Sequence, residues 1–175
     1  NFSGYDYIVS PSGSCVLHVK EHLQSDSLAN EAMNIRTRVF ELTEFLVDVV
    51  KVKNISARFN HKVGLHQSCH GQRGLKLSQM SELVSPAFSK PETLLRMVNG
   101  LIQLDRKDEC CGFGGTFCVG EEAVSVKMGK DRIEDHVQYG AEFITGNDMS
   151  CLMHLDGILK RQKSSTKVIH IAEIL

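Results

Sequence analysis

Residues 110–118 read Cys-Cys-Gly-Phe-Gly-Gly-Thr-Phe-Cys, and they place two adjacent cysteines directly before a glycine-rich turn. A disulfide between neighbouring residues closes a strained ring, so we do not expect one between Cys110 and Cys111. Two thiolates directed at one metal centre are the better interpretation, because the glycines allow positive φ angles and backbone N–H groups that point at sulfur. A tight turn after two buried cysteines explains this stretch equally well when it is taken alone.

Segments of alternating extended and helical character surround this turn. Strands are predicted at 5–10, 62–66, 101–104, 141–145 and 167–171, and helices at 14–22, 28–50, 91–98, 121–139 and 151–160. This alternation predicts an α/β fold with a largely parallel sheet, in which ligand sites gather at the carboxyl ends of strands. The helix over 28–50 is expected to bury one apolar stripe, formed by Val39, Leu42, Phe45, Leu46 and Val49.

The sequence also contains an internal repeat. Residues 4–18 align without gaps on residues 140–154, and both copies keep a strand, a turn and Ser-Cys-x-x-His, with Cys15 in one and Cys151 in the other. We therefore predict two modules: residues 1–60 are the C-terminal remnant of a first module with a connecting helix, and residues 61–175 are a complete second module. Without its first module the chain would expose apolar surface, so self-association into a homo-oligomer is expected.

The remaining cysteines of the second module complete a recognisable pattern. Cys69 follows Ser68, the Cys-Cys-Gly stretch comes next, and residues 151–154 read Cys-Leu-Met-His. Together with Ser-Pro-Ser-Gly-Ser-Cys at 10–15 and His-Ile-Ala-Glu at 170–173, this pattern resembles the cysteine-rich CCG domain of iron–sulfur oxidoreductases. That family includes components of heterodisulfide reductase, the iron–sulfur component of glycolate oxidase and lactate-utilisation proteins, and the resemblance is closest to the last. It covers essentially the whole chain and implies a Rossmann-like layered module.

The resemblance implies that four cysteines, Cys69, Cys110, Cys111 and Cys151, are thiolate ligands of a [4Fe-4S] cluster. It also implies an oxidoreductase subunit that transfers electrons within a complex oxidising L-lactate, or a related small 2-hydroxy acid, to the keto acid, together with partner subunits of that complex. The chain departs from the family pattern where a final Cys-x-x-Cys is expected, because His154 stands in the fourth position. Cys151 and His154 share one helix face at i and i+3, so His154 is a candidate metal ligand.

Two other functions remain open from the residues. One is a structural protein-interaction module that binds zinc through a Cys3His set, made of Cys69, either Cys110 or Cys111, Cys151 and His154. The long intervals between these ligands are unlike those of compact zinc modules. Alternatively, the vicinal pair could act as a thiol–disulfide redox centre.

The other cysteines and histidines have simpler interpretations. Cys118 is predicted to be a small buried hydrophobic residue, and Cys15 a free thiol. His66 and His70 flank Cys69; a role beside the metal is attractive, but a surface or core histidine is the more frequent explanation for each. His170 is predicted to be structural.

Composition narrows the classes of function further. The 175 residues carry a net charge of −1 with both signs interspersed, so we expect no nucleic-acid partner. No apolar run approaches the roughly 20 residues that span a bilayer, and residues 1–4 begin no signal peptide. A cytoplasmic location is therefore expected, where a reducing environment keeps the cysteines as thiols. Glycine motifs for nucleotide or dinucleotide binding are absent.

Overall fold

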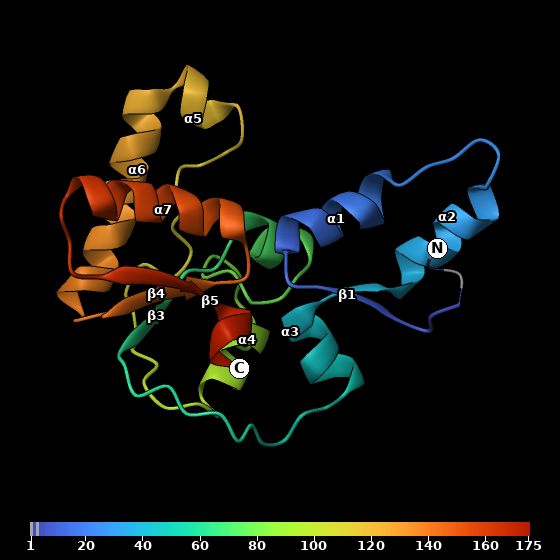
Figure 1. Cartoon of the computed structure of the whole chain (residues 1–175), viewed down its shortest axis with the longest axis horizontal. Helices are drawn as coiled ribbons and strands as arrows, with labels where there is room; N and C mark the ends of the chain where they lie inside the picture. The colour runs from blue at the N-terminus through green and yellow to red at the C-terminus, as the bar shows by residue number, and fades with distance from the viewer. Residues whose placement is uncertain (1, 3) are drawn as a thin grey trace.

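A computed structural model describes residue 2 and residues 4–175 of the chain. The strands are β1 (Ile8–Ser10), β2 (Val39–Glu41), β3 (Val63–Leu65), β4 (Phe143–Gly146) and β5 (Lys167–His170). The helices are α1 (Gly13–His22), α2 (Ala29–Arg38), α3 (Leu42–Glu44), α4 (Lys90–Leu95), α5 (Phe117–Gly120), α6 (Glu122–Gln138), α7 (Met149–Arg161) and α8 (Ile171–Ile174), with π-helical turns η1 (Phe45–Val49) and η2 (His70–Gly74). Figure 1 shows their arrangement.

Two parallel sheets organise the chain. One contains β3, β4 and β5 in that order, and the other pairs β1 with β2. The predicted α/β fold with parallel strands is therefore confirmed. Within the described residues, no helix combines the length and apolar character needed to cross a bilayer.

The three-stranded sheet separates two layers of apolar core. On one face, helices α6 and α7 contribute buried residues that pack with Ile144 of β4, Cys111 and Cys151. On the other face, α4 and α8 pack against Val63 and Leu65 of β3. Figure 1 shows α7 and the short helix α8 on opposite sides of β4 and β5, while α1 and β1 extend away from this body. Both cysteines of the first layer thus belong to the protein core.

The internal repeat is present in the structure and extends beyond residues 4–18 and 140–154. Strand β1 leads into α1 as β4 leads into α7, and the helices begin at equivalent residues, Gly13 and Met149. Strand β2 then leads into α3 as β5 leads into α8, each through a capping box, with Glu41 and His170 as the caps. The division into modules at residue 60 stays a prediction, and residues 1 and 3 of its first part lie outside the described residues.

The predicted helix over 28–50 is wrong. Helix α2 ends at Arg38, strand β2 pairs with β1 through Ile8 and Val39, and a new helical turn begins after Glu41. Strand pairing outweighs helical periodicity here because Val39 and Phe40 suit a strand and Glu41 caps the next turn. Of the predicted stripe, Val39 is buried and the other four residues are only partly buried.

The predicted strand over 101–104 is also wrong. The structure gives this segment one isolated bridge, between Val63 and Leu101, and no strand.

Glu41 makes the stability of this fold depend on pH. Its side chain is fully buried, Oε2 accepts hydrogen bonds from Thr43 N at 2.7 Å and Glu44 N at 3.2 Å, and burial raises the pKa of the carboxyl above its usual value of 4.5. Above pH 4.5 the unfolded chain loses this proton before the folded chain does, so stability should fall as pH rises through the interval between the two pKa values. We expect Glu41→Gln to flatten this decline and to raise stability at neutral pH in urea unfolding.

A matched control for Glu41→Gln is Glu92→Gln. Burial raises the pKa of Glu92, but the hydrogen bond from Arg96 and nearby cations leave it below the usual value. The contribution of Glu92 should therefore be lost toward acid pH and leave the decline above pH 4.5 in place. An unchanged pH profile in Glu41→Gln would contradict the assignment.

Candidate metal centre

The candidate site lies where β3 and β4 end, as predicted for a parallel sheet. His66 directly follows β3, Cys69 immediately precedes η2, and Cys151 lies in the first turn of α7 after β4. Cys110 and Cys111 come from the loop that precedes α5. Segments distant in the sequence therefore bring their thiols to one edge of the sheet.

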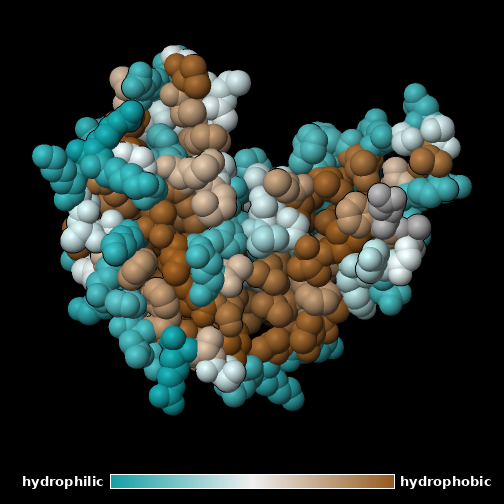
Figure 2. All heavy atoms as spheres, viewed as in Figure 1, coloured by the Kyte–Doolittle hydropathy of each residue, from teal (hydrophilic) through white to brown (hydrophobic). Residues whose placement is uncertain are grey.

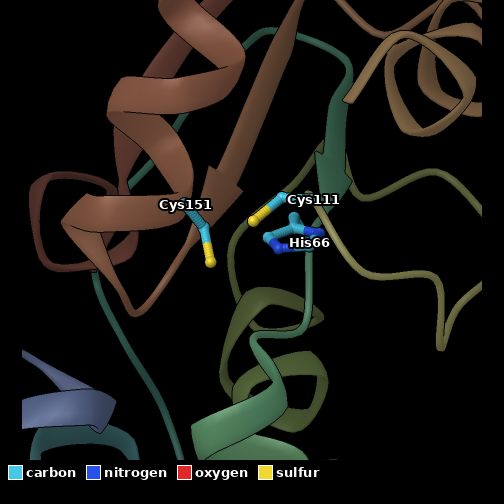
Figure 3. A group of neighbouring side chains, drawn as sticks. All are labelled: His66, Cys111 and Cys151. Atoms are coloured by element: carbon cyan, nitrogen blue, oxygen red, sulfur yellow. The ribbon is translucent and has the colours of Figure 1, made fainter. Parts of the chain in front are cut away.

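Three of these side chains form the buried part of the site. One ligand atom each from His66, Cys111 and Cys151 lies within 4.8 Å of the other two, and all three residues are buried. Figure 3 shows both sulfur atoms and the imidazole ring directed at one another. This is a donor set that a soft metal accepts.

The other two predicted cysteines adjoin this group through sulfur contacts. The side chain of Cys110 neighbours those of Cys69 and Cys111, and the side chain of Cys111 neighbours that of Cys151. Cys69 and Cys110 are half-buried, whereas Cys111 and Cys151 are buried. The structure therefore brings all four predicted cysteines together, and their role as ligands stays a prediction.

The sulfur contacts divide the four thiols into two donors and two acceptors. Hydrogen bonds from Cys111 and then Cys69 lower the pKa of Cys110 to about 2, and the hydrogen bond from Cys111 lowers the pKa of Cys151 to about 5. The same bonds raise the pKa of Cys69 and of Cys111. Thiolate is the form that binds metals, so a lowered pKa at Cys110 and Cys151 favours metal binding.

The glycine turn supports the cysteine pair as the sequence suggested. The amide of Gly112 donates to Cys110 Sγ at 3.4 Å, and the amide of Phe113 donates to Cys111 Sγ at 3.5 Å. Gly112, Gly114 and Gly115 all have positive φ angles. The turn therefore supplies N–H groups to both sulfurs in a backbone conformation that favours glycine.

His154 points elsewhere. Its Nε2 lies 3.4 Å from Ser125 Oγ and 3.3 Å from Ser125 O on α6, and its ring packs edge-on against Phe113. The group of side chains within 4.8 Å contains His66 in place of His154. A ligand role for His154 stays a prediction.

The remaining cysteines and histidines give mixed outcomes. Cys118 is only partly buried and donates to Gly115 O at 3.0 Å, so its prediction as a buried hydrophobic residue is wrong. Cys15 is an exposed free thiol and His70 is exposed, as predicted. His170 is structural, because it caps α8 by accepting from Ala172 N at 3.1 Å. A place beside the metal was the less favoured prediction for His66, which the structure groups with Cys111 and Cys151. The position of His66 at the end of a predicted strand was the signal that could have identified it.

The donor set fits an iron–sulfur cluster. Four thiols converge, two of them favour the thiolate form, and backbone N–H groups face the two vicinal sulfurs. These features match how proteins hold such clusters and tune them by hydrogen bonds to sulfur.

Comparison with known proteins finds similar sequences. A family model described as the CCG cysteine-rich domain matches residues 63–156. A protein named Lactate utilization protein A from Lysinibacillus sphaericus (strain C3-41) is 38% identical over 180 residues, which covers 99% of this chain and 75% of that protein. The proteins of the same name from Bacillus subtilis (strain 168) and Exiguobacterium sp. (strain ATCC BAA-1283 / AT1b) are 38% and 39% identical, over 99% and 97% of this chain and 71% and 68% of their own lengths.

Proposed function

Because this chain belongs to the CCG cysteine-rich domain family, together with the proteins named Lactate utilization protein A, we propose that it is an iron–sulfur redox subunit in lactate utilisation. The complex it serves would oxidise L-lactate, or a related 2-hydroxy acid, to the keto acid. The convergence of four cysteine thiols at the carboxyl ends of β3 and β4 is the observation that carries this proposal.

In the proposal Cys69, Cys110, Cys111 and Cys151 hold a four-iron cluster. When bound, such a cluster accepts and donates single electrons. Cys111 and Cys151 lie in the protein core and exclude water from their side of the site, while the half-buried Cys69 and Cys110 form its more accessible side. That side is the place where we expect electrons to be exchanged with a partner subunit.

The stoichiometry of the reaction requires a second electron-accepting centre, which a partner subunit would supply. Conversion of a 2-hydroxy acid to a keto acid releases two electrons and two protons, and a single cluster takes up electrons one at a time. The chain would therefore act as one member of a multi-subunit complex, with the acid bound by this chain or by a partner.

A structural zinc site is the second candidate. It is favoured by one observation, the buried group of His66, Cys111 and Cys151 with ligand atoms within 4.8 Å, because zinc binds mixed sulfur and imidazole sets. In that function the metal would only hold the loops together.

Metal analysis after anaerobic purification separates the two functions. We expect about four iron and four sulfide per chain, and loss of both in the Cys110→Ser/Cys111→Ser double variant. The control is Cys15→Ser/Cys118→Ser, which changes two cysteines outside the site and should keep the full content. About one zinc per chain without sulfide would contradict the redox proposal.

The lactate part of the proposal has its own test. The complex isolated through a tag on this chain should lose visible absorbance when L-lactate is added anaerobically, because the cluster becomes reduced. Absorbance that responds to dithionite but not to L-lactate would leave an electron-transfer protein with a different donor.

A further inference from the structure

His66 has one ring nitrogen whose role the fold does not explain. The side chain is 1% exposed, and its Nδ1 accepts a hydrogen bond from Arg132 Nε at 3.3 Å. Among the described residues, Nε2 is buried and has no hydrogen-bond partner, sulfur included. Figure 3 shows the ring beside the sulfur atoms of Cys111 and Cys151.

Arg132 is held firmly enough to fix this arrangement. Its guanidinium group donates to Asp135 Oδ2 at 2.6 Å, to the carbonyl oxygen of Arg106 at 2.6 Å and to that of Leu65 at 3.3 Å. Both Arg132 and Asp135 are fully buried. The direction of the Arg132 Nε–H bond is therefore set by strand β3, by the loop that contains Arg106 and by helix α6.

The tautomer of His66 follows from the chemistry of arginine. A guanidinium group has N–H donors and no acceptor, so Nδ1 of His66 must present its lone pair to Arg132. The single proton of the neutral ring then resides on Nε2, the nitrogen left for the sulfur atoms.

We infer that in the metal-loaded centre His66 donates an Nε2–H hydrogen bond to the sulfur of Cys111 or Cys151, and that Arg132 fixes the tautomer that makes His66 a donor. This inference rests on the proposed function where it concerns a cluster. His66 is then a positioning residue that stabilises negative charge on sulfur. An N–H donor to a cluster ligand favours the reduced, more negative state and raises the reduction potential.

Direct ligation by His66 is the competing arrangement. Nε2 could bind a metal only by giving up its proton, and Nδ1 already presents its lone pair to Arg132. Ligation would thus require a ring without any proton or a broken bond to Arg132. The structure favours donation for this reason.

The experiment compares two substitutions of His66 in the anaerobically reconstituted full chain. His66→Leu removes the donor, whereas the side-chain amide of His66→Gln can place an N–H close to the position of Nε2. The control is His22→Leu, which changes a histidine on α1 whose side chain is 61% exposed. Iron and sulfide are counted, and the midpoint potential is measured by redox titration monitored by electron paramagnetic resonance.

We expect His66→Leu to keep its iron and sulfide but to shift the ratio of reduced to oxidised protein about tenfold toward the oxidised form at a fixed potential. That change corresponds to about 59 mV for a one-electron couple. His66→Gln should recover most of this shift, and His22→Leu should show none. An unchanged potential in His66→Leu, or loss of iron in both His66 variants, would overturn the assignment.

A measurement on the unsubstituted protein decides the question even if His66→Leu does not fold. Long-range ¹⁵N NMR of the metal-loaded chain should show His66 protonated on Nε2 and unprotonated on Nδ1. If the chain holds zinc without sulfide, the redox function fails, while the same spectrum still tests His66. A metal-bound Nε2 would overturn the donor assignment in either metal form.

Discussion

Gly112→Ala is expected to destabilise the protein by about 2–5 kcal/mol and to abolish metal retention, because the backbone of Gly112, next to the cysteine pair, packs directly against helix α6. A Cβ atom at this position would lie 2.4 Å from the carbonyl oxygen of Ser125 and 2.9 Å from Met128 Cβ. The φ angle of +88° adds backbone strain for any residue with a side chain. Urea unfolding and iron analysis measure the two effects.

Gly115→Ala is the matched control within the same turn. Gly115 also has a positive φ, +62°, but a Cβ there would meet nothing within 4 Å. Only the conformational cost of about 1–2 kcal/mol is expected, and the metal should be retained. Equal losses in both variants would mean that the contact with α6 contributes nothing and that strain alone explains the requirement for glycine.

The sequence was enough to predict the chemistry of the glycine turn after Cys110 and Cys111. It was not enough to predict which distant residues pack around that turn. Adjacent cysteines followed by glycines indicate thiolates and N–H groups at one place whatever the rest of the chain does. Strands 141–145 and 167–171 were likewise close to β4 and β5, because short apolar runs bounded by turn residues are local signals. The four cysteines converge because parallel strands end at one edge of a sheet.

The failures over 28–50 and at His66 depend on contacts between distant segments. Strand β2 exists because Val39 pairs with Ile8, and nothing in the local sequence of 28–50 reveals that pairing. The role of His66 depends on Arg132, which lies 66 residues later on α6. The internal repeat is the one sequence signal that reaches so far, and extending it to Glu41 and His170 would have revealed both capped turns.

Arg132→Met is expected to destabilise the protein by about 3–5 kcal/mol, because it leaves the buried carboxylate of Asp135 without its closest cation. The remaining cation, Arg106, has its Nε at 3.7 Å from Asp135 Oδ1 and is itself partly exposed. The carbonyl oxygens of Leu65 and Arg106 also lose their donor. Urea unfolding of the metal-free reduced chain measures the loss without a contribution from metal binding.

Lys127→Met provides the control on the same helix. Lys127 pairs with Asp131 one turn away, as Arg132 pairs with Asp135, but its side chain is 71% exposed. Ion pairs in water contribute little, so the expected change is below about 1 kcal/mol. If the two variants lost similar stability, the Arg132 network would not be a rigid support for His66. The predicted tautomer of His66 would then lose its physical basis, because only a fixed guanidinium group can hold the ring proton on the nitrogen that faces sulfur.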